Sequence, residues 1–331
     1  MKTLKVGITY NVKKNIHSDI PDAEAEFDDM ETIFAIKGAL ETDGFDTELF
    51  EADKNLPVRL LEKMPDVVFN VAEGLAGRGR EAQVPAILNF LGIPFTGSDE
   101  TTMCIAMDKA LCKRLAASHG VSTPSYSLFK SGDSLPEGNL TFPVIVKPNT
   151  EGSSKGISNY SIVNDEDSLR RLLGEKINVY KQDMLLEEYI SGREFTVGIL
   201  GNGNDIKVFS PMEIIFNDIN HSIYSYDVKR NFKQHVRYRC PPDIRDALME
   251  EIENTAKKIY CFLECRDMAR IDFRLSAEGQ LYFIELNPLP GLAPEYSDFP
   301  MLAAFCGMEY SVLICNILKC ALNRYGIVHK V

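Results

Sequence analysis

The stretch RIDFRLSAEGQLYFIELN, residues 270–287, constrains the fold of this chain more than any other. Polar and apolar residues alternate along both of its halves, as they do in strands that bury one face. Glu278 and Gly279 separate the halves, and a pair of this kind is typical of a tight hairpin turn. With these two residues as the turn, Ala277 lies opposite Gln280. The stretch therefore predicts an antiparallel hairpin with two different faces.

The predicted register gathers polar side chains on one face of this hairpin. It pairs Asp272 with Glu285 and Arg270 with Asn287, because side chains two residues apart share a face. Carboxylate and amide oxygens are ligands that suit Mg²⁺. A polar hairpin face can also be simply solvated, so this pattern alone leaves a metal site and a solvated face open. The opposite, apolar face is predicted to carry Ile271, Phe273, Ile284 and Leu286.

A glycine- and serine-rich loop is the second feature with chemical meaning. KPNTEGSSKGIS, residues 147–158, begins at the end of the apolar run FPVIVKP. Glycines let backbone N–H groups approach phosphate oxygens, and Ser153 and Ser154 add hydroxyl donors. Lys147 is placed to reach the phosphates as a point charge. The spacing differs from the P-loop pattern G-x-x-x-x-G-K-[ST], so we predict a phosphate-binding loop of another kind.

Strand and helix signals alternate along the first hundred residues. LKVGITY and DVVFNVAE predict strands, while DMETIFAIKGALETDG and REAQVPAILNFLG predict amphipathic helices that end at Gly44 and Gly92. This alternation predicts a parallel, Rossmann-like sheet in residues 1–98. GLAGRG, residues 74–79, follows a strand, but its spacing is not that of a dinucleotide-binding loop, which counts against a dehydrogenase.

The remaining sequence divides into two further units. Residues 99–185 contain the basic amphipathic helix MDKALCKRLAASHG and the glycine-rich loop. Residues 186–331 contain the basic stretch KRNFKQHVRYR, a long helix from about Ile244 to Leu263, and the hairpin. The predicted fold class is α/β, with α+β character in the C-terminal half.

The composition argues against several classes of protein. A formal net charge of −12 argues against a general nucleic-acid binder, and no apolar run approaches the length of a membrane span. The N-terminus has the pattern of a first strand rather than of a signal peptide, which favours the cytoplasm. Eight cysteines occur without any C-x-x-C pair and mostly within apolar helical patterns, so we predict buried reduced thiols.

Assembled in this order, these stretches resemble the ATP-grasp superfamily and, within it, the D-alanine–D-alanine ligases. The resemblance rests on LGIPFTGS…MDK, VIVKP…EGSSKGIS, LLEEYISGREFTVGILG and RIDF…FIELNPLPG, and it covers nearly the whole chain. It implies an N-terminal Rossmann-like pre-ATP-grasp domain followed by a two-subdomain ATP-grasp fold, with ATP between two antiparallel sheets. It also implies a homodimer formed through the N-terminal unit.

The resemblance also implies a role for each residue that matches a family motif. For ATP it implies phosphate contacts from Lys109 and Lys147, adenine recognition by Glu187 and by the backbone of Glu188 and Ile190, a ribose contact from Glu194, and a lid containing Ser153 and Ser154. It implies two Mg²⁺ ions, with Mn²⁺ as an alternative, held by Asp272, Glu285 and Asn287. Arg270 and the N–H of Gly291 would stabilise an oxyanion, and Lys229 would approach the transferred phosphate.

The amino-acid pocket departs from the family pattern. The family joins an early glutamate, a loop serine and a tyrosine there, and Ser153 matches the serine. Ala25 stands at the glutamate position with glutamates on both sides, of which Glu26 is our candidate. Arg230 stands at the tyrosine position, and Glu73 stands where the family has a histidine. The exchange of a neutral phenol for a guanidinium changes the field around a substrate.

The acceptor side of the pocket differs as well. LAPEYSDFP replaces the family's serine-rich segment with one extra residue, so Tyr296 and Ser297 compete for the acceptor-serine position. We predict an ATP-dependent carboxylate–amine ligase that forms an amide through an acyl phosphate from small amino-acid or carboxylate substrates. Two alternatives stay open: a true D-alanine–D-alanine ligase of peptidoglycan synthesis, and a non-catalytic ATP-binding regulatory module.

Overall fold

The computed structural model describes residues 3–14, 22, 24–133, 140–152, 155–156, 161–217 and 235–328. Four predicted site residues lie outside this described part of the chain: Ser153, Ser154, Lys229 and Arg230.

The N-terminal part forms a parallel sheet with strand order β2-β1-β3. A parallel bridge from Val68 to Phe95 extends the sheet where the sequence predicted its end. Both predicted strands and both predicted helices are present, and Gly92, at φ +67°, ends the second helix. The elements are β1 (Lys5–Tyr10), α1 (Met30–Thr42), β2 (Asp46–Glu51), α2 (Leu56–Lys63), β3 (Val67–Val71), η1 (Arg80–Ala82) and α3 (Gln83–Leu91).

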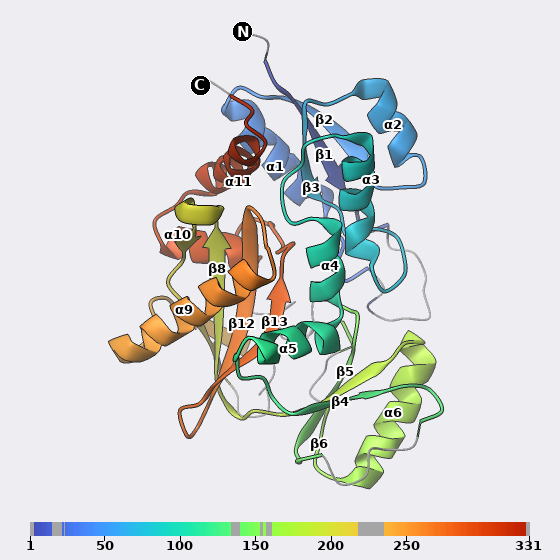
Figure 1. The fold of residues 1–331 in the computed structure, drawn as a ribbon, viewed down its shortest axis with the longest axis vertical. Helices are drawn as coiled ribbons and strands as arrows, with labels where there is room; N and C mark the ends of the chain where they lie inside the picture. Colours follow the sequence, from blue (N-terminus) through green and yellow to red (C-terminus); the bar gives the residue numbers. More distant parts are fainter. Residues whose placement is uncertain are drawn as a thin grey trace.

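The central part is an antiparallel sheet with strand order β4-β7-β5-β6 and α6 packed on it (Figure 1). Two helices, α4 and α5, lead from the N-terminal sheet into it. The boundary that we proposed between residues 185 and 186 falls inside β7, which pairs with both β4 and β5. The elements are α4 (Glu100–Met107), α5 (Lys109–Ser118), β4 (Tyr126–Phe129), β5 (Val144–Pro148), β6 (Ile162–Val163), α6 (Glu166–Tyr180) and β7 (Met184–Glu188).

The C-terminal part is a second antiparallel sheet with strand order β11-β10-β8-β12-β13, and β9 pairs with β8. Figure 1 shows α9 lying across this sheet and α11 lying beside α1 of the N-terminal unit. The elements are β8 (Gly192–Leu200), η3 (Gly203–Asp205), β9 (Lys207–Val208), β10 (Met212–Phe216), β11 (Val236–Arg239), α9 (Asp246–Phe262), β12 (Met268–Ser276), β13 (Leu281–Asn287), α10 (Asp298–Phe305) and α11 (Tyr310–Arg324). The fold is therefore the predicted combination of one parallel and two antiparallel sheets.

Strands β12 and β13 form the predicted hairpin, but its turn differs from the prediction. Ser276, rather than Ala277, faces Gln280: the Ser276 N–H donates to the Gln280 carbonyl at 2.9 Å. The loop thus has three residues, and Gly279, its last, has φ +85°, a conformation that glycine adopts without strain. Our pairing of Ala277 with Gln280 is therefore wrong.

A β-bulge restores the predicted register before the polar end of the hairpin. The pairing changes between Asp272 and Phe273, so that Phe273 faces Phe283 while Asp272 still faces Glu285. The extra residue of the bulge is Ile284, which is half-buried. Phe283 takes the core position that we predicted for Ile284, and it is 1% exposed. The predicted polar face is thus confirmed, although the turn that suggested it is not the one that forms.

The described residues test two predictions drawn from composition. All eight cysteines lie among them and are free thiols. Three of them are buried and three are half-buried, but Cys104 and Cys261 are exposed, so the prediction of burial is wrong for these two. No single described helix is long and apolar enough to cross a membrane.

Candidate active site

Glu187 on β7 lies between two buried lysines from different elements. Its Oε1 accepts a hydrogen bond from Lys147 Nζ on β5 at 2.8 Å, and its Oε2 lies 2.6 Å from Lys113 Nζ on α5. Burial by itself raises the pKa of the Glu187 carboxyl, but the two ammonium groups outweigh burial and hold that pKa below its ordinary value. The predicted phosphate lysine and the predicted adenine glutamate therefore form one ionised network.

Lys113 is a member of this network that the sequence analysis missed. Its Nζ also donates to the Ile284 carbonyl at 2.8 Å, at the bulge of β13. It lies one helical turn after Lys109, and this i, i+4 spacing, which places both lysines on one face of α5, is the signal that could have revealed it. Because Lys113 contacts both Glu187 and the bulge, it links the central sheet to the carboxylate hairpin.

Lys109 begins α5 and points toward the carboxylates of the hairpin. Asp108 caps the helix by accepting from the Leu111 N–H at 3.0 Å. Lys109 Nζ donates to the Glu151 carbonyl and lies 3.5 Å from Glu285 Oε2. The loop that begins at β5 and the hairpin are therefore both within reach of one ammonium group.

The polar face of the hairpin is held by a dense set of contacts around Asp272. Its Oδ1 accepts from Thr196 Oγ1 at 2.6 Å and from Arg270 Nε at 3.1 Å. Its Oδ2 accepts from Arg270 Nη2 at 2.9 Å and from Asn287 Nδ2 at 3.2 Å. Since Asn287 turns its NH₂ group to Asp272, its amide oxygen is left to face a ligand. The four predicted residues of this face, Arg270, Asp272, Glu285 and Asn287, thus lie together.

Arg270 carries its charge in a buried position. Burial works against the charged form, but Asp272 and Asp298 outweigh it and raise the pKa of the guanidinium above its ordinary value. Asp298 Oδ2 lies 3.6 Å from Arg270 Nη1. The guanidinium is therefore a fixed positive charge beside the predicted metal ligands.

The residues predicted for adenine and ribose lie together at the junction of β7 and β8. Glu194 accepts from Arg274 Nη2 at 2.7 Å, and Arg274 Nη1 donates to the Ile190 carbonyl at 2.8 Å. The N–H of Glu188 donates to the Ser125 carbonyl at 2.8 Å, so this N–H already has a partner. Burial raises the pKa of Glu194 despite the nearby guanidinium. Arg274 is a second residue that the sequence analysis missed.

The segment after the hairpin distinguishes the two acceptor candidates. Ser297 is 9% exposed and its Oγ accepts from the Ala293 N–H at 3.1 Å, whereas Tyr296 is 39% exposed. A Cβ atom on Gly291 would lie 2.8 Å from Ser297 Oγ, so this glycine permits the close approach. Ser297, and not Tyr296, therefore lies against Gly291.

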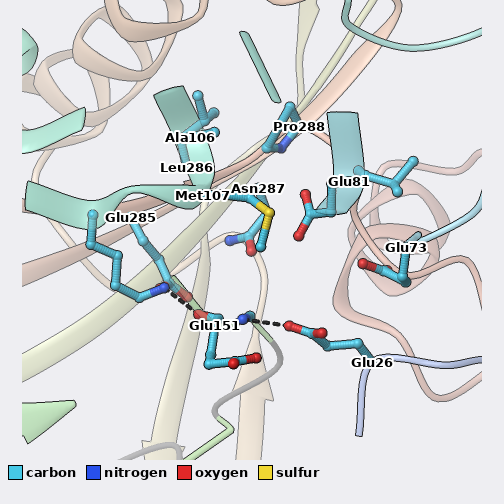
Figure 2. A pocket seen from close by; sticks show the side chains of 13 residues that line it. Glu26, Glu73, Glu81, Ala106, Met107, Glu151, Glu285, Leu286, Asn287 and Pro288 are labelled. Carbon is cyan, nitrogen blue, oxygen red and sulfur yellow. Dashed lines mark hydrogen bonds and ion pairs between the residues drawn. The ribbon is translucent and has the colours of Figure 1, made fainter. Parts of the chain in front are cut away.

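A pocket that is open to solvent and has a cavity volume of about 40 Å³ joins the hairpin to the N-terminal unit (Figure 2). One wall carries Lys109, Glu285 and Asn287, and the other wall carries carboxylates from three separate segments. The acidic lining residues are Glu26, Glu73, Glu81, Glu151 and Glu285. Of the predicted substrate residues, Glu26 and Glu73 line this pocket.

Glu26 is held in place by an arginine that the sequence analysis missed. Arg80 donates to both Glu26 oxygens, through Nε at 3.0 Å and through Nη2. Arg80 Nη1 also donates to the Thr150 carbonyl at 2.8 Å, and Nη2 lies 3.2 Å from Glu151 Oε2. The N–H of Gly152 donates to Glu26 as well. The early glutamate and the glycine-rich loop are thus joined through one guanidinium.

Glu73 and Glu81 complete the acidic wall. Burial raises the pKa of both carboxyls. The negative charges of Glu81 and then Glu26 raise the pKa of Glu73 further, well above its ordinary value, and the charge of Glu26 raises the pKa of Glu81 to about 7. Arg80 acts in the opposite direction on both. The wall therefore favours either protons or a positively charged ligand.

Two antiparallel sheets, a buried lysine–glutamate network and a carboxylate-bearing hairpin in the C-terminal sheet define the class of an ATP-dependent ligase with the ATP-grasp fold. A family model described as the C-terminus of D-ala D-ala ligase matches residues 115–319. The chain belongs to the D-alanine–D-alanine ligase family.

Individual relatives cover most of the chain. It is 36% identical over 292 residues to a D-alanine–D-alanine ligase of Aquifex aeolicus, covering 87% of this chain and 94% of the relative. An uncharacterized protein of Sinorhizobium fredii is 33% identical and covers 88% of this chain and 87% of its own length. The vancomycin B-type resistance protein VanB of Enterococcus faecalis is 30% identical over 78% of this chain and 74% of the relative.

A solved structure agrees with the fold. The D-alanine–D-alanine ligase from Bacillus anthracis complexed with ATP superposes with a TM-score of 0.77 at 23% identity, covering 98% of this chain and 99% of that chain.

Proposed function

We propose that this ligase joins a carboxylate substrate to an amine through an acyl phosphate, with an amino-acid pocket that differs from that of a D-alanine–D-alanine ligase. The observation that carries the proposal is the single pocket in which Lys109, Glu285 and Asn287 face Glu73 and Glu81. One wall suits a nucleotide and its metal ions, and the opposite wall suits a small substrate that is not alanine.

ATP lies, in this proposal, between the central and C-terminal sheets. Lys147 and Lys109 contact its phosphates, and the segment from Glu187 to Ile190 meets the adenine. Glu194 binds the ribose. The ion pair of Lys147 with Glu187 supports this arrangement, because it holds a buried lysine extended from β5 before any phosphate arrives.

The donors on the hairpin fit Mg²⁺. Asp272, Glu285 and Asn287 offer hard oxygen atoms from opposite positions of one hairpin, and the Asn287 amide is turned with its nitrogen toward Asp272. Lys109 Nζ lies 3.5 Å from Glu285 Oε2, so its ammonium group neutralises part of the negative charge at this site. When bound, two Mg²⁺ ions, or Mn²⁺ in their place, neutralise charge on the phosphates.

In the reaction, the substrate carboxylate attacks the γ-phosphate of ATP and ADP leaves. A neutral amine then attacks the acyl carbon of the acyl phosphate, loses a proton and expels inorganic phosphate. The fixed charge of Arg270 and the N–H of Gly291 stabilise the oxyanion that forms in the second step. Ser297 contacts the acceptor. Ser153, Ser154, Lys229 and Arg230 keep their predicted roles in the lid and the basic stretch.

We further propose a homodimer in the cytoplasm that acts on small molecules, without nucleic-acid or membrane partners. Exposed apolar side chains on the N-terminal helices support a subunit contact there. Phe34 on α1 is 55% exposed and Phe90 on α3 is 91% exposed.

D-alanine–D-alanine ligation is the second candidate, because the relative from Aquifex aeolicus carries that name. Two features count against it. Glu73 places a carboxylate where the family has a histidine, and Arg80 occupies both oxygens of Glu26. The methyl side chain of alanine forms neither an ion pair nor a hydrogen bond with these charged groups.

The test is phosphate release from ATP and Mg²⁺ with D- and L-amino acids, singly and in pairs, with mass spectrometry of every active mixture. We expect an amide product from a pair other than D-alanine with itself. A product from D-alanine alone would establish the second candidate. ATP binding with no product from any pair would favour a non-catalytic module.

A further inference from the structure

The acidic wall of the pocket has more negative charge than its neighbours neutralise. Arg80 pairs with Glu26 and Glu151, Lys155 also pairs with Glu151, and Lys109 pairs with Glu285. Among the described residues, no side chain or backbone N–H donates to Glu73 or Glu81. Among the described residues, these two carboxyl groups are therefore the acidic side chains of the pocket that have no ion-pair or hydrogen-bond partner.

Both carboxylates are directed into the pocket. Figure 2 shows the Glu73 and Glu81 side chains entering from the side opposite Glu285, with their oxygens turned toward the space that Asn287 borders. Glu73 follows β3 directly, and Glu81 lies in η1, so short segments next to regular structure position both. A ligand that fills the pocket meets them on the side opposite Glu285.

The geometry also limits what kind of cation suits these two residues. No three acidic, histidine or cysteine side chains among the described residues lie close enough together to hold a metal ion. A cationic ligand for these two carboxyl groups is therefore one that reaches them through hydrogen bonds. Ammonium and guanidinium groups have several N–H donors and fit this requirement.

We propose, building on the ligase function above, that the carboxylate substrate carries a side-chain ammonium or guanidinium group that binds between Glu73 and Glu81. Its reacting carboxylate lies at the Lys109–Glu285 wall. The α-ammonium of an ordinary amino acid lies one carbon from its carboxylate, so it stays near that wall. A cation at the end of a side chain spans the pocket. The substrate class is thus a basic amino acid or a related diamino or guanidino acid.

Matched pairs of amino acids test the charge separately from the shape. Binding is measured by calorimetry with Mg²⁺ and a non-hydrolysable ATP analogue, using both enantiomers of lysine against norleucine, ornithine against norvaline, and arginine against citrulline. We expect at least one cationic member to bind about tenfold or more tightly than its neutral partner, because charge-assisted hydrogen bonds to two carboxylates are lost in the partner.

Two single variants and their double variant test whether Glu73 and Glu81 cause the preference for the cationic amino acid. Glu73→Gln and Glu81→Gln should each reduce the ratio of the two affinities, and the double variant should bring it close to one. Glu62→Gln, an exposed substitution on α2 with the same change of charge, should leave the ratio as it is. Equal binding of both members of every pair, or a ratio that survives the double variant, would overturn the inference.

Turnover separates this inference from the proposed function. Amide formation from neutral acids in preference to cationic ones would refute the inference and leave the ligase function intact. If no acid is ligated, the proposed function fails, and the affinity ratios still decide whether the acidic wall selects a cation.

Discussion

At the scale of single residues, Lys113 has the largest role among those that no motif revealed. It is fully buried, and burial lowers the pKa of its ammonium even though Glu187 opposes this. A buried lysine is costly unless it is paired, and here one ammonium serves Glu187 and the carbonyl of Ile284.

Replacement of Lys113 should therefore affect both stability and nucleotide binding. In Lys113→Met the Glu187 carboxylate keeps only Lys147, and we expect a loss of about 3 kcal/mol in the free energy of unfolding. Affinity for the ATP analogue should fall as well, because the variant lacks the ammonium group that connects Glu187 to the hairpin. Urea unfolding and calorimetry measure the two effects. Lys257→Met, on the exposed face of α9, is the control and should change neither.

Glu81 should make stability depend on pH. Its pKa is about 7 in the folded protein against 4.5 ordinarily, so the folded state keeps a proton that the unfolded state loses between these values. Stability from this group is therefore complete below pH 4.5 and falls as pH rises toward 7. Titratable and charged groups that face it are Glu26, Glu73, Glu151, Arg80 and Lys109.

In Glu81→Gln this contribution disappears. Relative to the unmodified protein, the variant should gain stability as pH rises from 5 to 7.5, by at most about 3 kcal/mol. Urea unfolding at several pH values gives the difference directly. A constant difference across this range would show that Glu81 ionises as an ordinary carboxyl.

At the scale of elements, the hairpin shows what sequence patterns can and cannot predict. Alternation along β12 and β13 predicted which side chains share a face, although the pairing of Asp272 with Glu285 was derived from a turn that does not form. It could not predict the three-residue loop or the bulge at Ile284. Each shifts the pairing by one residue, and the two shifts cancel.

The same limit applies to the candidate site. Residues on strands and at helix starts, such as Lys147 and Lys109, could be predicted because local patterns define their positions. Arg80 could not, because its partners Glu26 and Thr150 are distant in sequence. Lys113 had one local signal, its i, i+4 spacing from Lys109, but that spacing does not reveal its distant partner Glu187. Long-range pairing of charges has no local signature.

The turn of the hairpin should matter for stability but not for the site. Gly279→Ala places a side chain at φ +85° and should cost about 1 kcal/mol, measured by urea unfolding. Affinity for the ATP analogue should stay unchanged, because the register at Asp272 is set beyond the bulge. Gly38→Ala in α1, where nothing lies within 4 Å of the new Cβ, is the matched control and should stabilise slightly. A loss of nucleotide affinity in Gly279→Ala would show that the turn also affects the nucleotide site.

At the scale of the whole molecule, a buried ion pair of the C-terminal unit forms hydrogen bonds to the backbone of the N-terminal unit. Asp267 is fully buried and accepts from the Gly97 N–H at 2.8 Å and from Arg324 Nη2 at 2.7 Å. Arg324 also donates to the Phe95 carbonyl at 2.8 Å. This cluster ties the end of the parallel sheet to β12 and α11, and so fixes the acidic wall relative to the hairpin.

Arg324→Met should cost about 3 kcal/mol in the free energy of unfolding, because it leaves the buried Asp267 without its cation. It should also weaken substrate binding more than nucleotide binding, since only the substrate touches both units. Urea unfolding and the calorimetric assay measure these effects. Arg170→Met removes an exposed pair with Glu166 on α6 and should cost no more than about 0.5 kcal/mol. Similar losses in the free energy of unfolding in both variants would argue that this cluster does not connect the two units.

The position of the acidic wall in the sequence has a consequence for how such enzymes change their substrates. The family model begins at residue 115, whereas Glu26, Glu73 and Glu81 all precede it. The segment that this family model covers thus holds the hairpin and Ser297, and the segment before it holds these three carboxylates of the acidic wall. An exchange of the first hundred residues between relatives would carry selectivity across while the ligation machinery stays in place. Chimeric chains made in this way offer a route to ligases with new donors.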